Sequence, residues 1–206
     1  VFEGFGASGK GVQIGKLIQS MDPRGFQVFP IKAETEDERM HPFLWRFWTK
    51  TPEAGRIAIF DGSWYRKVLI DRFEKRTREK EIETAFHSIE AFEKQLTDGG
   101  TILVKLLLDI DQKEQKKRFE KLLEKKETAW RVSQGDRERN AKYSEYAAMM
   151  EEVLYRSDTK SAPWTVIEAT DRRFATVKIY MTVIHALAEA VEAVQRRRME
   201  EQAIKA

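Results

Sequence analysis

"FEGFGASGKG", residues 2–11, is the stretch that decides the fold class of this chain. Four residues separate Gly4 from Gly9, and Lys10 follows Gly9 directly. Small residues at this spacing let backbone N–H groups point into one concavity, where a following helix adds the positive end of its dipole. Lys10 supplies a point charge at the same place. The stretch therefore predicts a phosphate-binding loop made of Gly4, Phe5, Gly6, Ala7, Ser8, Gly9, Lys10 and Gly11.

The flanks of this loop have to be a strand and a helix for the prediction to hold. Val12, Leu17 and Met21 recur at near-helical spacing after the loop, which predicts the helix. Only residues 1–3 precede the loop, so we expect the natural chain to begin further upstream. Gly11 stands where the usual loop has a metal-binding Ser or Thr. An ordinary glycine-rich turn therefore stays open as the alternative.

Strand and helix patterns alternate along the rest of the chain. This order predicts an α/β fold in which a parallel sheet is covered on both faces, as three α/β/α layers. The chain is long enough for one domain, residues 1–206. The expected strands are 26–33, 56–63, 101–110 and 164–169, and the expected helices are 43–50, 81–96 and 172 to the end.

The section between the last two strands, about residues 111–156, is charged and too long for a simple crossover. We interpret it as a helical lid. Residues 113–142 within it carry eleven Lys or Arg against six Asp or Glu, a net charge of +5 in a chain of net charge +3. This local excess predicts a polyanionic partner. A solvated helix face is the alternative.

Composition excludes several classes of site and partner. The chain has no cysteine, which excludes disulfides and thiolate zinc sites. Its three histidines, His41, His87 and His185, lack metal-site spacing. No apolar run is expected to span a membrane, so no membrane partner is predicted. No aromatic stripe interleaved with basic residues points to nucleic acid.

Two acidic residues close apolar strands, where ligands of parallel sheets bind. These are Asp61, after "IAIF", and Asp109, after "VKLLL". A carboxylate at this position holds magnesium directly or through water in nucleoside triphosphate sites. Asp61 is accordingly the predicted metal ligand. Its alternative is to cap the helix that follows, a role open equally to Ser63.

Four motifs resemble the second family of polyphosphate kinases, and together they cover nearly the whole chain. They are "FEGFGASGKG", "ETEDERMHPFLWRFW", "IFDGSWYRKVLIDR" and "SAPWTVIEATDRRFATVKI". The resemblance implies a P-loop kinase-like fold with a helical lid. It implies magnesium-assisted phosphoryl transfer between inorganic polyphosphate and AMP, ADP or ATP. It also implies a cytoplasmic enzyme that forms a homo-oligomer or carries a fused second domain.

The same resemblance identifies two departures from the family pattern. The family continues its loop with Lys-Gly, so Gly11 is expected. However, the family has aspartate at position 6 and arginine at position 62, where this chain has Gly6 and Gly62. The alternative function is therefore a catalytically degenerate scaffold half of a tandem polyphosphate:AMP phosphotransferase, which still binds polyanion.

Phosphoryl transfer needs cations aligned around a group of dispersed negative charge. We expect Lys10, Asp61, Arg66 and Lys67 to be catalytic. We expect Arg46, Arg72 and Lys105 to contact phosphate or nucleotide, with a surface ion pair as the alternative for Arg46 and a carboxylate partner as the alternative for Lys105. The lid should bind polyphosphate through Lys125, Lys126, Arg131 and Arg137.

Overall fold

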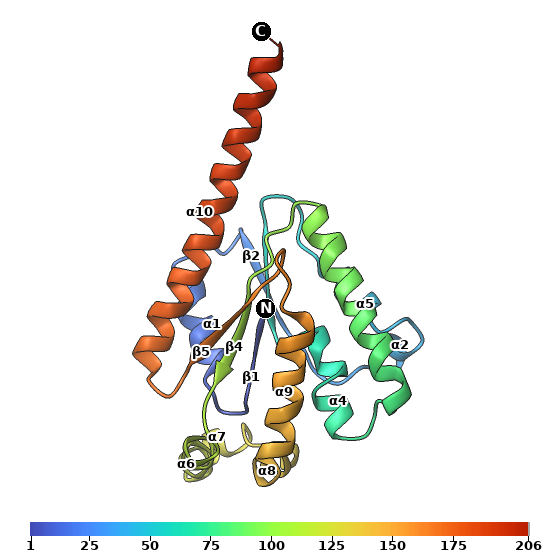
Figure 1. Ribbon diagram of the computed structural model, residues 1–206. Coiled ribbons are helices and arrows are strands. Elements are labelled where there is room, and N and C mark those ends of the chain that lie inside the picture. The colour runs from blue at the N-terminus through green and yellow to red at the C-terminus, as the bar shows by residue number, and fades with distance from the viewer. Residues whose placement is uncertain (206) are drawn as a thin grey trace.

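The computed structural model describes the backbone of residues 1–205 and the side chains of residues 1–196, 199 and 200. Within that range, parallel strands form one sheet at the centre of the molecule (Figure 1). Its order is β2-β3-β1-β4-β5, so the chain crosses from one side of β1 to the other between β3 and β4. The strands are β1 Phe2–Gly4, β2 Phe26–Pro30, β3 Ile57–Asp61, β4 Lys105–Asp109 and β5 Trp164–Glu168.

Strand β4 lies beside β1 in the sheet and is buried on both faces. Leu106, Leu107 and Leu108 are all buried, as expected for a continuous apolar run in a parallel sheet. The register pairs Phe2 with Leu106 on one side and with Asp61 on the other. The short strand β1 is thereby fixed between β3 and β4, and the loop that follows it emerges at the carboxyl edge of the sheet.

Helices cover both faces of this sheet, which confirms the predicted three-layer α/β/α fold. Helices α1 (Lys10–Ile18) and α10 (Arg172–Lys205) pack together on one face. Helices α5 (Glu79–Asp98) and α9 (Tyr143–Ser157) form the layer on the other face. In α5, the periodic apolar residues Ile82, Phe86, Ile89 and Phe92 are buried against the sheet.

The charged section after β4 divides into two parts with different surroundings. Helices α6 (Gln112–Leu123), α7 (Lys126–Ala129) and α8 (Gln134–Ala141) gather at the carboxyl edge of the sheet, at the bottom of Figure 1. We call these three the lid helices. Helix α9 instead packs in the core through Tyr146, Met150 and Val153. The lid in this structure is therefore shorter than the expected 111–156.

Short helices connect the strands on the β2–β3 side. They include α2 (Glu36–Arg39), α3 (Trp45–Trp48), the 3-10 helix η1 (Trp64–Lys67) and α4 (Ile70–Phe73). The aromatic side chains of this region form part of the core. The Phe47 ring packs on Phe60 and Trp64, and Trp48 meets the edge of Phe92.

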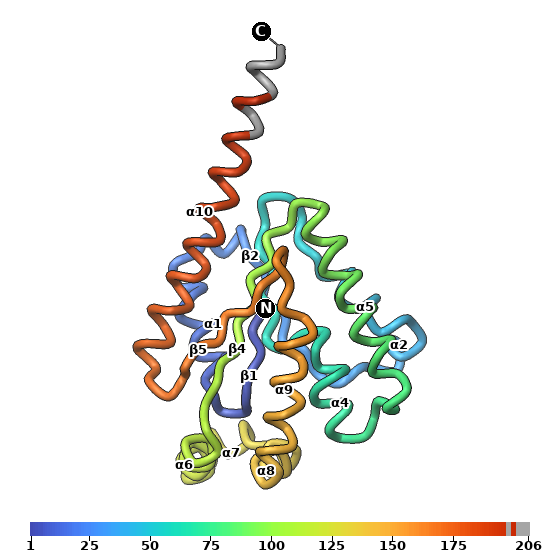
Figure 2. The backbone as a smooth tube through the Cα atoms, in the orientation of Figure 1, coloured from blue at the N-terminus to red at the C-terminus, as the bar shows by residue number. Residues whose placement is uncertain are grey.

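Helix α10 extends beyond the domain, as the backbone trace in Figure 2 shows. Its segment Arg172–Arg196 is long and apolar enough to cross a membrane when judged by length and composition alone. The expectation that no segment passes this test is therefore wrong. Ala175 and Ile179 face the domain and are buried, whereas Phe174, Val177 and Ile184 are exposed, so apolar residues occupy more than one face. A helix mostly buried in a protein core passes the same test, but only 11% of the apolar window of α10 is buried.

Candidate phosphate-binding and phosphoryl-transfer site

The predicted loop lies between β1 and α1, so both flanking elements are present. Gly4 ends β1 at a φ of 138°, and a Cβ there would lie 2.2 Å from the carbonyl oxygen of Leu108 on β4. Gly9 caps α1 with a φ of 106°. L-residues rarely adopt such backbone angles, so the turn from strand to helix depends on glycine at both positions.

The loop carries two polar side chains, those of Lys10 and Ser8, and one open position at Gly11. Lys10 Nζ donates hydrogen bonds to the carbonyl oxygen of Gly4 at 2.8 Å and of Phe5 at 3.4 Å. The Ser8 hydroxyl is buried and has no hydrogen-bond partner in the described part of the chain. At Gly11, no neighbouring atom lies within 4 Å of the Cβ position, so the place of the usual Ser or Thr is open.

Carboxylates surround β1 at the same edge of the sheet. Asp61 ends β3 beside β1, and Asp109 ends β4 on its other side. Glu3 is buried and accepts a hydrogen bond of 2.7 Å from the Ser63 hydroxyl. Burial raises the pKa of Glu3, an effect that Lys10 opposes and Asp61 reinforces. Burial also raises the pKa of Asp109.

A metal ion at this site has to rely on few protein ligands. Among the described residues, no group of three or more His, Cys, Asp or Glu side chains could hold a metal on its own. Asp61 remains an available carboxylate, because the described residues give it no ion-pair partner. Magnesium is commonly bound by one or two carboxylates together with substrate phosphates. The residues present fit this mode of binding, and the described part of the chain forms no metal site from protein ligands alone.

The predicted cations Arg46, Arg66 and Lys67 differ in whether a carboxylate of the protein pairs with them. Arg66 Nε lies 3.3 Å from a carboxylate oxygen of Asp71, and Lys67 Nζ lies 5.9 Å from the centre of the Phe43 ring. Arg46 is buried, and its Nε lies 3.3 Å from a carboxylate oxygen of Glu38. Arg66 and Lys67 belong to η1, shortly after β3 in the chain, whereas Arg46 belongs to α3.

Arg72 has two carboxylate partners inside the domain. It donates to Glu152 of α9 at 2.6 Å and to Glu79 of α5 at 2.8 Å. The guanidinium therefore joins two helices of one layer. Both partners of the guanidinium are thus carboxylates of the protein, and the expected nucleotide contact stays a prediction.

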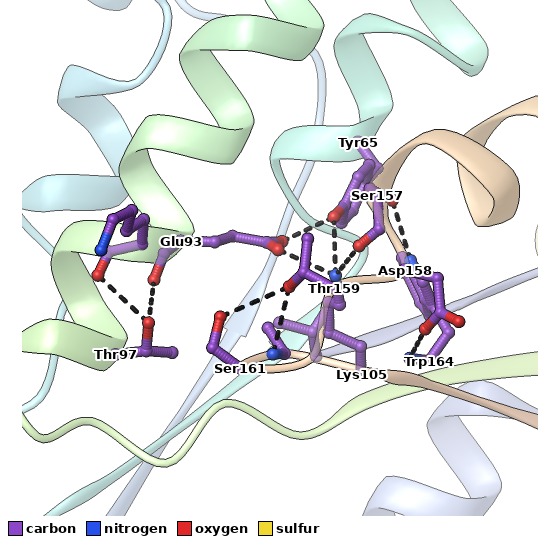
Figure 3. A network of polar contacts seen from close by, with 12 residues as sticks. Tyr65, Glu93, Thr97, Lys105, Ser157, Asp158, Thr159, Ser161 and Trp164 are labelled. Atoms are coloured by element: carbon purple, nitrogen blue, oxygen red, sulfur yellow. Dashed lines mark hydrogen bonds and ion pairs between the residues drawn. The ribbon is translucent and has the colours of Figure 1, made fainter.

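Lys105 lies at the start of β4, the edge opposite the phosphate loop. Its Nζ is fully buried and donates to a carboxylate oxygen of Glu93 at 2.8 Å, to the carbonyl oxygen of Ser157 at 2.7 Å and to the Tyr65 hydroxyl at 3.1 Å (Figure 3). Burial lowers the pKa of Lys105, against the opposing attraction of Glu93. Its partner is a carboxylate of α5, so the structure does not bring Lys105 to the predicted site.

The two departures from the resembled family have different surroundings. Gly62 adopts a φ of 74°, in the left-handed region. The φ of Gly6 does not lie in the left-handed region. A Cβ at position 6 would nevertheless lie 2.8 Å from Asp136 Oδ1 of α8 and 3.2 Å from the Phe119 ring of α6. The lid helices therefore occupy the space that a side chain at position 6 would need.

The four predicted lid cations are all exposed. None of them forms an ion pair with a described residue, and Arg131 lies over the Trp130 ring at 5.4 Å. They are thus free to meet a polyanion in solution. They are Lys125, Lys126, Arg131 and Arg137.

Sequence reasoning missed two side chains of α6 that contact the loop backbone. Gln115 donates to the carbonyl oxygen of Gly6 at 3.0 Å, and Arg118 donates to those of Ala7 and Ser8 at 3.2 and 3.0 Å. Both residues are buried. Their signal in the sequence is weak, because a polar residue in a charged helix normally faces solvent.

Comparisons with known proteins agree with this geometry. The sequence model of the family described as Polyphosphate kinase 2 matches residues 1–197. A Polyphosphate:AMP phosphotransferase of Pseudomonas syringae is 40% identical over 190 residues, which are 92% of this chain and 38% of that protein. The namesake of Pseudomonas aeruginosa is 38% identical over the same shares. This chain thus spans 38% of the length of these curated relatives.

Solved structures show the same fold. A crystal structure described as polyphosphate kinase 2 from Pseudomonas aeruginosa PA01 superposes with a TM-score of 0.89 at 37% identity, covering 93% of this chain and 41% of that one. The structure of Polyphosphate Kinase 2 from Arthrobacter aurescens TC1 gives a TM-score of 0.84 at 33% identity, covering 94% of this chain and 67% of that one.

Proposed function

Since this chain belongs to the polyphosphate kinase 2 family, we propose that it transfers a phosphoryl group between inorganic polyphosphate and a nucleotide, AMP or ADP. The relatives named above for AMP, and a GDP-polyphosphate phosphotransferase of Mycolicibacterium smegmatis at 31% identity, support the class of reaction. They also favour an active domain over a degenerate scaffold half. The reaction needs little covalent help from protein, and it depends on alignment and on cations.

One observation carries the proposal: a phosphate loop with Lys10 at the carboxyl edge of the sheet, next to Asp61 at the end of the adjoining strand. The backbone N–H groups at the start of α1 and the Lys10 ammonium bind phosphate oxygens. In the structure Lys10 Nζ donates to the Gly4 carbonyl oxygen at 2.8 Å, and a bound phosphate would replace that acceptor.

A kinase family of this kind points to a divalent metal in general, and we propose magnesium. Asp61 is the residue of this chain that would hold the ion, and the ion would neutralise charge on the transferred phosphate. Arg66 and Lys67 would complement it from the opposite end of the η1 turn. The lid cations Lys125, Lys126, Arg131 and Arg137 would hold the chain of polyphosphate beyond the reacting group.

We further propose that the enzyme is cytoplasmic and that it assembles as a homo-oligomer or with a fused second domain. The relatives support the second form, because each is much longer than this chain. ATP is the expected product or donor on the nucleotide side, depending on the direction of transfer.

The test is phosphorylation of AMP and ADP by polyphosphate in the unmodified chain and in Lys10→Ala. We expect Lys10→Ala to lose about 100-fold in transfer rate, as for loss of a transition-state charge contact. Its affinity for polyphosphate or ADP, measured by calorimetry, should fall about tenfold. Lys80→Ala, at an exposed position on α5, is the matched control and should keep both. Equal binding and equal rates in Lys10→Ala would remove the phosphate-loop assignment.

A further inference from the structure

Three consecutive carbonyl oxygens of the loop are bound from the same side, by α6. Gln115 Nε2 donates to Gly6, and Arg118 Nη1 donates to both Ala7 and Ser8. Both donors are buried, with Gln115 1% and Arg118 7% exposed. A loop built mainly of small residues has little packing of its own, so these bonds decide which way its peptide groups face.

The orientation of the carbonyls fixes the orientation of the amides. In a trans peptide, the C=O of one residue and the N–H of the next point in opposite directions. Carbonyls of residues 6, 7 and 8 that face α6 therefore direct the N–H groups of residues 7, 8 and 9 away from it. Ser8 N–H closes a turn on the Phe5 carbonyl at 3.1 Å. The N–H groups of Ala7 and Gly9 find no acceptor within the described residues, and remain available to an anion.

Arg118 uses all of its hydrogen-bonding capacity in this position. A guanidinium has five N–H donors, and each of them has an acceptor here. Nε binds Glu114 at 2.7 Å, and Nη2 binds the chain between β5 and α10 at 2.8 and 3.0 Å. A lysine ammonium has only three donors, and it lacks the planar fork of N–H groups that a guanidinium presents. The five acceptors are the side chain of Glu114 and the carbonyl oxygens of Ala7, Ser8, Ala169 and Thr170.

Gln115 extends the same network into the lid. Its Oε1 accepts a hydrogen bond of 2.8 Å from Asn140 of α8, while its Nε2 binds the loop. Asn140 also donates to the Gln112 carbonyl at 3.2 Å. The position of the loop is thus tied both to the end of the sheet, through Arg118, and to the lid, through Gln115.

We propose that Gln115 and Arg118 are positioning residues that hold the phosphate loop in its anion-binding conformation before the ligand arrives. This inference rests on the proposed function. Neither side chain contacts the substrate. They act by fixing the amides of Ala7 and Gly9, which removes the cost of ordering the loop when phosphate binds.

The test uses substitutions that leave the fold in place. Gln115→Met keeps the volume of the side chain and removes one bond to the loop, and Arg118→Lys keeps the charge but loses the fork. We expect transfer rates to fall about tenfold in Gln115→Met and about 100-fold in Arg118→Lys. Lys116→Met, at an exposed position on α6, is the matched control. Circular dichroism and thermal unfolding establish that each variant is folded.

Two readouts separate positioning from a merely structural role. Pyrophosphate, which offers only two phosphate groups, should lose affinity in both variants by calorimetry, whereas its affinity should stay unchanged in Lys116→Met. Amide hydrogen exchange at Ser8, whose N–H is bonded to the Phe5 carbonyl oxygen, should accelerate in the unliganded variants. In Arg118→Ala, millimolar guanidinium should restore part of the rate, and ammonium, which lacks the fork, should not.

The outcomes distinguish this inference from the proposed function. Folded Gln115→Met and Arg118→Lys with full transfer rates and full pyrophosphate affinity would overturn the positioning role and leave the function standing. An unmodified chain that transfers no phosphate would overturn the function, and the pyrophosphate titration would then decide the positioning role alone. If Arg118→Lys does not fold, Gln115→Met decides it in the same way.

Discussion

Glycine stands at positions 4, 6 and 62 for three different physical reasons. Gly4 allows close approach to the Leu108 carbonyl, and Gly62 adopts a left-handed φ of 74°. Gly6 has neither constraint, and instead leaves room for Asp136 of the lid. A residue other than glycine at position 62 would pay about 1–2 kcal/mol in backbone strain. Restoring the family's arginine there therefore costs stability, whatever it adds to catalysis.

At position 6 we predict an energetic coupling with Asp136. Gly6→Ala places a Cβ 2.8 Å from Asp136 Oδ1, so the carboxylate has to move and its bonds to Ser133 and Arg139 weaken. Asp136→Ala removes the obstacle. The double variant should thus be about 1 kcal/mol more stable than the sum of the two single changes predicts.

The free energy of unfolding in denaturant measures this cycle. Gly15→Ala is the matched control, because Gly15 lies in α1 with open space around its Cβ position, and it should stabilise the helix by up to about 1 kcal/mol. Gly6→Asp is expected to be worse than Gly6→Ala, since it adds a second negative charge beside Asp136. Additive single changes at positions 6 and 136 would show that Asp136 does not restrict the space for a side chain at position 6.

At the scale of elements, the sequence predicted the strand–loop–helix unit and the layers, because periodicity and glycine spacing are local signals. It did not predict that α9 packs in the core and not with the lid helices, although Tyr146, Met150 and Val153 have the helical spacing of a buried face. It placed Lys105 at the site because a lysine in an apolar strand needs a partner. The partner comes from α5, and pairing between distant elements has no local signal.

The hydrogen bonds that Lys105 makes to Tyr65, Glu93 and Ser157 join β4 to η1, α5 and the end of α9. Their loss should destabilise the packing of these four elements. Lys105→Met leaves Glu93 buried without its cation, and should cost about 3–5 kcal/mol of unfolding free energy. Adding Glu93→Gln removes the buried charge and should recover part of that loss.

Lys94→Met is the control for this prediction. Lys94 and Asp98 form an exposed pair on the same helix, with side chains 69% and 62% exposed, and its loss should cost no more than about 0.5 kcal/mol. Chemical denaturation measures all of these variants. A Lys105→Met protein as stable as Lys94→Met would show that the buried network contributes little.

At the scale of the whole molecule, the charge excess of the lid should make polyphosphate binding depend on salt. Log affinity for long-chain polyphosphate should fall linearly with log salt concentration. Replacing Lys125, Lys126 and Arg131 by Gln together should reduce the slope by about 2, at roughly 0.7 per lost contact.

A second triple variant tests whether the position of the charge matters. Lys80, Lys160 and Arg196 are exposed, lie outside the lid helices and form no ion pair with a described residue, so their change to Gln should leave the slope nearly unaltered. Fluorescence titration across a salt series gives both slopes. Equal slopes in the two triple variants would identify the lid charge as a solvated face.

Phosphoryl transfer itself is the measurement that tests the account most directly. The purified chain is mixed with polyphosphate, magnesium and AMP or ADP, without ATP, and followed by phosphorus NMR. We predict new nucleotide phosphoanhydride signals that grow as polyphosphate is consumed, and their loss in Lys10→Ala prepared in the same way. A folded chain that binds polyphosphate and nucleotide yet forms no such signal would contradict the account.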